Sequence, residues 1–376
     1  MPKHLQLVIL LLTTTLWAMA EEPASRIYRS GGEWIEEVTG TLAAGKNVKV
    51  KTQVGPIHIQ GGQQNTVTFT IHKHVRAGSE EAARRELGRL RVVAYTTSDG
   101  AIIRSEGEGV SRVFMDFDIH VPSQTAFVKL ETNGGAVSAN GISGKVEANT
   151  GGGAIHLDQI GGSISAASGG GDIGIGKVGG DVRVETGGGT IQIESAGGQI
   201  VASSRGGTLL IGTGSTMKLQ TGGGSIKVSK CTGAINASSG GGAIELNDVG
   251  AAQVATGGGS IRVTSVHGGL RAETGGGAIV AELAAGKGAF TDSRLETPAG
   301  DIVVYIPDNL GVNIRAAVEV PQDSGISSDF PELRITRSNE KWGPREAFAE
   351  GSLNGGGPVL HVHTTNGHIE FKRKKQ

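Results

Sequence analysis

A repeat of 17 or 18 residues constrains the fold of this chain more than any other feature. Each unit reads apolar, any, apolar, any, Thr or Ser, followed by three turn residues and a second alternating apolar run. The hydroxyl positions are Thr132, Thr150, Ser168, Thr186, Ser204, Thr221, Ser239, Thr256 and Thr274. Apolar residues at every second position predict two short strands per unit, each with one buried face. We therefore expect an all-β chain that forms a parallel two-sheet β-solenoid, with one flattened coil per unit.

The expected interior of this solenoid is thin and aliphatic. One predicted inward row places a large aliphatic residue in each unit, opposite small residues such as Ala148 and Ala237. The row is Ile155, Ile173, Ile191, Leu209, Ile226, Ile244, Ile261 and Ile279. No Phe, Tyr or Trp occurs between Val128 and Ala289, as expected where two sheets leave no room for rings. Ile244, inside this row, should therefore contribute strongly to stability.

Other positions of the unit also have predicted structural roles. Thr150 lies two residues after Ala148, so its side chain should point inward, where the hydroxyl can bind backbone groups at the corner. Cys231 shares the repeat position of Ile160 and Val249, and we expect a buried packing residue rather than a redox or metal thiol. Glycine, with 64 of 376 residues, should supply positive φ angles and close backbone approach at the corners.

The first 20 residues have the pattern of a secretory signal peptide. Lys3 precedes the apolar run Leu5–Leu12, and Ala18-Met19-Ala20 predicts cleavage after Ala20. A transmembrane anchor is the alternative interpretation, but the run is short for a bilayer. We expect an exported protein, periplasmic, cell-surface or extracellular, with no integral membrane segment after signal cleavage. Its single cysteine excludes an intramolecular disulfide.

The mature chain divides into three predicted regions. Residues 21–130 form an N-terminal capping β region with a short helix near 79–90, which Ser79 can cap. Residues 131–305 form the regular β-solenoid. Residues 306–376 form a C-terminal cap, in which the charged and turn-rich insertion 321–358 interrupts the repeat. Degenerate units at 48–59 and 360–371 are predicted to be capping coils that cover exposed sheet edges.

Three sequence features together suggest a family. They are the recurring Thr-Gly-Gly-Gly-Ala-Ile units, Val121-Pro122 before the first repeat, and the closing segment Thr364–Ile369. In these features the chain resembles the bacterial "putative adhesin" family of signal-bearing, glycine-rich β-solenoid proteins, over roughly residues 48–371. The likeness lies in repeats and not in a catalytic signature. It implies an envelope or surface interaction without naming a ligand.

Composition and motifs argue against several other functions. Lys and Arg number 35 against 36 Asp and Glu, a balance that gives no reason to expect a nucleic-acid partner. The segment 174–179 matches G-x-G-x-x-G, but the alternation predicts a strand after it, where a dinucleotide site needs a helix. Asp158, Asp172 and Asp181 do not share one repeat position, which argues against a calcium ladder. We predict no cofactor.

Histidines are the weak candidates for metal ligands. His361 and His363 alternate on one predicted strand, and His368 lies just beyond them. Such a pair can bind zinc or copper. The two histidines fall at outward positions of the last coil, however, where solvated surface histidine is the commoner explanation. We therefore predict no metal.

An enzyme is the disfavoured class, because outward side chains show no local concentration of acid or base. At one outward position of the first strand in each unit, the successive residues are Glu147, Ser165, Arg183, Val201, Lys218, Asn236, Gln253 and Arg271. A β-helix polysaccharide-acting enzyme would need gathered carboxylates and usually aromatic rings. We predict a non-catalytic exported cell-envelope or surface protein, an adhesin-like interaction module for an unidentified envelope or surface protein or glycan. The alternative is a purely structural envelope spacer.

Specific binding is expected in the insertions or caps. Trp342 and Arg345 are the partner-binding candidates, because Trp and Arg are frequent among binding hot spots. Trp342 has a second interpretation, in which its ring covers the open end of the solenoid. The regular coils are expected to expose short, chemically mixed side chains without an aromatic-lined groove.

Overall fold

The fold was analysed in a computed structural model that describes residues 23–107, 112–285, 290–321, 325–338 and 346–374. The predicted signal peptide, residues 1–20, lies outside these residues, as do Trp342 and Arg345. Within them the chain is all-β, as predicted, with a 32-stranded hydrogen-bonded sheet and one short helix. No helix in the described ranges is long and apolar enough to cross a membrane.

The N-terminal part contains the helix and several antiparallel strands. Helix α1 (Glu80–Leu87) begins where the sequence predicts, because the Ser79 hydroxyl accepts a hydrogen bond from the backbone N–H of Ala82 at 3.2 Å. The strands of this part are β1 (Ala24–Ser30), β2 (Glu33–Ala43), β3 (Asn47–Thr52), β4 (Ile57–Gly62), β5 (Thr66–Val75), β6 (Arg91–Thr97), β7 (Gly100–Glu106) and β8 (Phe114–Pro122).

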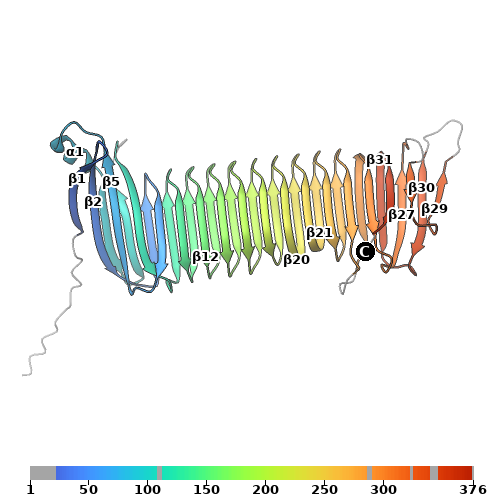
Figure 1. The fold of residues 1–376 in the computed structure, drawn as a ribbon, viewed down its shortest axis with the longest axis horizontal. Helices are drawn as coiled ribbons and strands as arrows, with labels where there is room; N and C mark the ends of the chain where they lie inside the picture. Colours follow the sequence, from blue (N-terminus) through green and yellow to red (C-terminus); the bar gives the residue numbers. More distant parts are fainter. Residues whose placement is uncertain (1–22, 108–111, 286–289, 322–324, 339–345, 375–376) are drawn as a thin grey trace, which may run out of the picture.

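The regular part contributes short strands in steady alternation. They are β9 (Phe127–Thr132), β10 (Val137–Ile142), β11 (Lys145–Thr150), β12 (Ile155–Ile160), β13 (Ile164–Ser168), β14 (Ile173–Val178), β15 (Val182–Thr186), β16 (Ile191–Ala196), β17 (Ile200–Ser204), β18 (Leu209–Gly214), β19 (Met217–Thr221), β20 (Ile226–Ser239), β21 (Ile244–Thr256), β22 (Ile261–Val266), β23 (Leu270–Thr274), β24 (Ile279–Leu283), β25 (Ser293–Ala299) and β26 (Ile302–Ile306). Figure 1 shows them side by side along the long axis of the molecule.

Parallel pairing sorts these strands into two ladders. In the first ladder β10 pairs with β12 and β12 with β14, whereas in the second β11 pairs with β13 and β13 with β15. The register joins Val146 to Ile164, one repeat later, so the sequence repeat becomes the repeat of layers. β20 and β21 are long enough to belong to both ladders and connect them.

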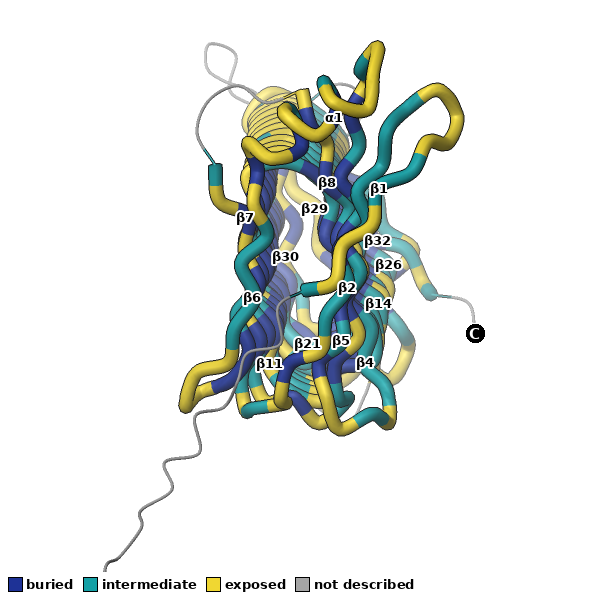
Figure 2. Tube along the Cα trace, turned by 90° about the vertical axis from the view of Figure 1, so that its left-hand side faces the viewer, coloured by how far each residue is buried: buried dark blue, intermediate teal, exposed yellow. Residues whose placement is uncertain are grey.

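The core lies between the two ladders. Viewed along the long axis, the chain forms two facing walls whose inner sides are buried (Figure 2). Ile244 belongs to this interior, as do the facing residues Ala148 and Ala237. Cys231 is only 1% exposed, as its repeat position predicts, and its Sγ lies 3.4 Å from the backbone oxygen of Ser215. Alternation in the sequence therefore assigns inside and outside correctly at these positions.

The Thr and Ser residues of the repeat form a buried hydroxyl column at one corner. The Thr150 hydroxyl donates to the backbone oxygen of Gly135 at 2.8 Å and accepts from the backbone N–H of Gly153 at 3.1 Å. Thr186, which lies one unit after Ser168 and one unit before Ser204, makes the equivalent two bonds: its hydroxyl donates to the backbone oxygen of Gly171 and accepts from the backbone N–H of Gly189. Each hydroxyl thus binds a carbonyl of the preceding layer and an amide of its own corner. The inward orientation predicted for Thr150 is confirmed.

Corner glycines are needed for close approach. A Cβ on Gly187 would lie 2.0 Å from the backbone oxygen of Gly169, whereas a Cβ on Gly188 would meet nothing within 4 Å. None of these three glycines has a positive φ. The predicted need for positive φ is therefore wrong at these stacked corners. Layers in register bring the corner backbones together, so a side chain would have no room even in an ordinary backbone conformation.

The ends of the ladders also differ from the prediction. The remaining strands are β27 (Val312–Val318), β28 (Ile326–Ser328), β29 (Arg334–Arg337), β30 (Ala347–Leu353), β31 (Val359–Asn366) and β32 (Ile369–Arg373). β3 lies between β7 and β9, and β31 lies between β25 and β27. Neither predicted capping coil is therefore terminal.

Among the described strands, β1, β6, β28 and β29 pair on one side only, and they form the outer edges. All four residues of β29 are exposed and two are Arg, a polar composition that discourages edge-to-edge pairing.

Candidate binding groove

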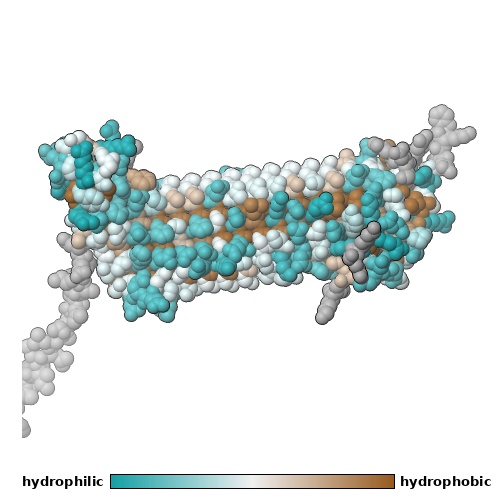
Figure 3. All heavy atoms as spheres, in the orientation of Figure 1, coloured by the Kyte–Doolittle hydropathy of each residue, from teal (hydrophilic) through white to brown (hydrophobic). Residues whose placement is uncertain are grey.

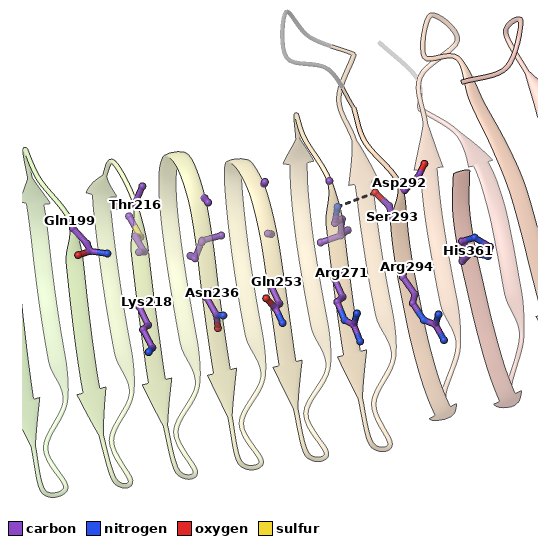
Figure 4. A pocket seen from close by; sticks show the side chains of 17 residues that line it. Gln199, Thr216, Lys218, Asn236, Gln253, Arg271, Asp292, Ser293, Arg294 and His361 are labelled. Atoms are coloured by element: carbon purple, nitrogen blue, oxygen red, sulfur yellow. Dashed lines mark hydrogen bonds between the residues drawn. The ribbon is translucent and has the colours of Figure 1, made fainter. Parts of the chain in front are cut away.

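A long groove follows the outer face of the second ladder toward its C-terminal end. It consists of two adjoining cavities of about 660 and 320 Å³, which share Arg294 and His361 as lining residues. Side chains from successive strands project along the larger cavity (Figure 4). The groove extends from Gln199, just before β17, to β30, so regular coils and the insertion 321–358 both contribute to it.

Strand register places one outward residue of each layer beside the next along this groove. The register joins Lys218 to Asn236, Asn236 to Gln253, and Gln253 to Arg271. It then continues through β25, β31 and β27. We call the complete set the donor row, and it comprises Lys218, Asn236, Gln253, Arg271, Arg294, His361 and Arg315. Every member of this row is exposed.

The floor of the larger cavity is made of small residues, each two positions before a member of the donor row. They are Thr216, Ala234, Ala251 and Gly269. Short side chains beside the longer donor row leave a depression in the surface. The face seen in Figure 3 likewise has hydrophilic and hydrophobic residues in rows parallel to the long axis, because registered layers repeat each side-chain position.

The donor row divides into paired and unpaired groups. Arg271 Nε donates to Glu273 Oε1 at 2.8 Å, and Arg294 Nη2 lies 2.5 Å from Glu296 Oε1. Hydrogen bonding to Arg294 lowers the pKa of the Glu296 carboxyl, so this pair is fully ionised at neutral pH. The side chains of Lys218, Asn236 and Gln253 have no hydrogen-bond partner in the described part of the chain, so their donors are free to bind a ligand.

An exposed aromatic ring borders the smaller cavity. Phe348 is 39% exposed and belongs to β30, and it lies near Ala317, Arg315 and Glu350. The register places Phe348 directly opposite Ala317, whose short side chain leaves the ring face uncovered. The cavity therefore combines a ring with charged groups of both signs.

The three candidate histidines take different places. His361 lies in the donor row, His363 Nε2 lies 3.1 Å from Glu319 Oε1, and His368 Nε2 lies 3.1 Å from the Ser327 hydroxyl. His361 and His363 both line the smaller cavity, whereas His368 is not among its lining residues. Across the described ranges, no three His, Cys, Asp or Glu side chains are grouped so that they could hold a metal ion.

The basic end of the donor row was missed in the sequence. The regular repeat relates these outward positions only as far as Arg271, and the prediction that they show no local concentration of base is wrong beyond that residue. Irregular spacing hid the rest, because the strands of the second ladder after β23 no longer follow at 17 or 18 residues. One signal was available: the tetrapeptides Arg-Ala-Glu-Thr at 271–274, Arg-Leu-Glu-Thr at 294–297 and His-Val-His-Thr at 361–364 share one pattern.

Comparison with known proteins gives little beyond this geometry. No protein-family model and no curated protein matches the chain. Among solved structures, a "putative cell adhesion protein" from Clostridium sporogenes is 10% identical with a TM-score of 0.20, covering 94% of this chain and 100% of its own. A "putative adhesin" from Parabacteroides distasonis is 9% identical with a TM-score of 0.29, covering 90% and 97%. A "putative lipid binding protein" from the same species is 8% identical with a TM-score of 0.25, covering 91% and 97%. Since each TM-score is below 0.5, we draw no functional argument from these likenesses.

Proposed function

We propose that this protein is an exported, non-catalytic interaction module of the cell envelope or cell surface, which binds its partner as an adhesin does. In this proposal residues 1–20 are removed on export, and residues 131–305 are the regular part of a two-sheet β-solenoid. The groove on the second ladder is the binding face. The observation that carries the proposal is the donor row, which presents exposed polar and basic groups from neighbouring strands above a floor of small residues.

The scaffold suits the presentation of such a face. Registered strands fix the outward side chains at a spacing of ~4.8 Å. The hydroxyl column and the glycine contacts hold the corners of each layer. Sites built on strands keep their geometry better than sites built on loops. A ligand would therefore meet a surface that is largely pre-organised.

The chemistry of the groove supports binding over catalysis. Glu296 lines the smaller cavity and its pKa is lowered, because Arg294 stabilises the ionised form. A general acid in a glycosidase needs the opposite shift, so that it holds a proton at neutral pH. Asp292 accepts a hydrogen bond from the backbone N–H of Val359 at 2.8 Å, which suits a structural role.

The test is co-sedimentation of the purified mature protein with isolated bacterial cell envelopes. We expect the wild-type protein to sediment with the envelopes and the double variant Arg271→Ala/Arg294→Ala to lose at least nine-tenths of that binding. Arg183→Ala is the matched control, because Arg183 occupies the same outward position on β15 but lies outside the groove.

The outcomes separate the module from the alternative. If the double variant and the Arg183→Ala control sediment as the wild type does, the groove is not the binding face. If the wild-type protein does not sediment at all, the proposal fails, and a structural spacer becomes the better description of this chain.

A further inference from the structure

The donor row is long and straight because it crosses the strands. Its residues come from successive neighbours in the second ladder, from β19 to β27. At ~4.8 Å per strand, the row from Lys218 to Arg315 spans roughly 29 Å. A small molecule would occupy only part of it. The geometry therefore favours a ligand that is itself an extended chain lying along the long axis.

The groups of the row are mainly hydrogen-bond donors. Lys218 carries an ammonium, and Arg271, Arg294 and Arg315 carry guanidinium groups, each with more N–H groups than one carboxylate partner can accept. The acidic partners Glu273 and Glu296 lie two residues along the strand and are less exposed than the arginines. The donor row itself therefore presents four cations and no carboxylate, although the exposed carboxylates of Asp292 and Glu350 also line the groove.

The amides in the row add a different capability. Asn236 and Gln253 occupy neighbouring layers, and each can donate and accept, as the hydroxyl groups of a sugar require. Neither amide is occupied by another side chain in the described part of the protein. Phe348, farther along, offers an exposed ring whose face can pack against an apolar sugar face.

We propose that this groove binds one extended chain of an acidic polysaccharide, with its carboxylates on the basic members of the donor row. The idea rests on the proposed function, because it names the partner of the same face. The sugar hydroxyls bind Asn236 and Gln253, and one sugar ring packs on Phe348. The floor residues, which include Ala234 and Ala251, leave room for the backbone of the ligand.

Other polymers fit the groove less well. A protein partner would favour an exposed apolar centre, whereas the long exposed side chains of this groove are amides and cations, and its larger apolar lining residues, Met217, Ile235 and Leu270, are buried. A single-stranded nucleic acid would call for several stacking rings, and Phe348 is the one Phe, Tyr or Trp in the lining of the two cavities. A carboxylated glycan needs only the donors and the ring that are present.

The test measures binding of the mature protein to immobilised polygalacturonate, with neutral dextran as the second polymer. We expect binding to polygalacturonate that weakens as NaCl is raised, and at least tenfold weaker binding to dextran. Arg271→Ala/Arg294→Ala should weaken binding to polygalacturonate at least tenfold. Phe348→Ala should weaken it about threefold or more, and Arg183→Ala should leave it unchanged.

Two results would overturn the inference. One is equal binding of dextran and polygalacturonate, because the cations would then have no role. The other is no binding of either polymer. Envelope co-sedimentation shows whether only the polysaccharide proposal fails or the proposed function fails with it. If the double variant still loses envelope binding, the proposed function stands and only the ligand class is wrong. If neither assay responds to the double variant, both proposals fail.

Discussion

The hydroxyl column should contribute measurably to the free energy of unfolding, and Thr186→Val tests it. Thr186 is 1% exposed, donates to Gly171 O at 2.8 Å and accepts from Gly189 N–H at 3.3 Å. Valine keeps the shape but removes both bonds, leaving a carbonyl and an amide without their partner. Since a buried unsatisfied polar group costs about 1–3 kcal/mol, we expect a loss of about 3 kcal/mol in total.

Urea unfolding followed by far-UV circular dichroism measures this loss. The midpoint should fall while the slope stays the same, because the surface exposed on unfolding does not change. Thr232→Val is the matched control, since Thr232 is exposed and should change the stability by no more than about 0.5 kcal/mol. Equal midpoints for the two variants would refute the idea that the hydroxyl column stabilises the corner.

Three further outcomes follow from the packing. Ile244→Lys places a charge in the apolar interior and should cost at least ~3 kcal/mol, whereas Asn236→Lys at an exposed position should leave the urea midpoint nearly unchanged. Gly187→Ala should lower the free energy of unfolding by about 2 kcal/mol, because the added Cβ would meet the backbone of Gly169, whereas Gly188→Ala should leave it unchanged. Equal losses for the two variants would contradict the close-approach argument. Burial raises the pKa of the Cys231 thiol, so iodoacetamide should label the native protein slowly at neutral pH and rapidly after unfolding; fast labelling of the native protein would count against a packing role.

Much of the regular fold could be predicted because the repeat makes every layer alike. Alternation assigned Ile244 and Ala148 to the interior, and parity assigned Thr150 to the corner. The start of α1 followed from the capping residue Ser79. These features depend on local periodicity and local hydrogen bonding, both of which can be identified in a short segment of sequence.

The candidate groove could be predicted only in part. Lys218 and Asn236 were placed outward by alternation, but Arg294 and Arg315, farther along the donor row, could not be aligned with them without the strand pairings. Phe348 was equally hidden, because its strand joins the ladder by antiparallel pairing with β27. Long-range pairing is not encoded in residue spacing once insertions interrupt the repeat.

The sequence by itself determined the β class, the thin aliphatic interior and the hydroxyl column of this protein. Each follows from side-chain size and alternation within a unit. Only the tertiary structure decided which strands lie at the ends, that the corner glycines serve close approach and not positive φ, and that basic residues far apart in the chain form one row. The physical reason is that these features depend on contacts between layers. The order in which layers stack is set by hydrogen bonding across the whole chain, as β31 shows by lying between β25 and β27.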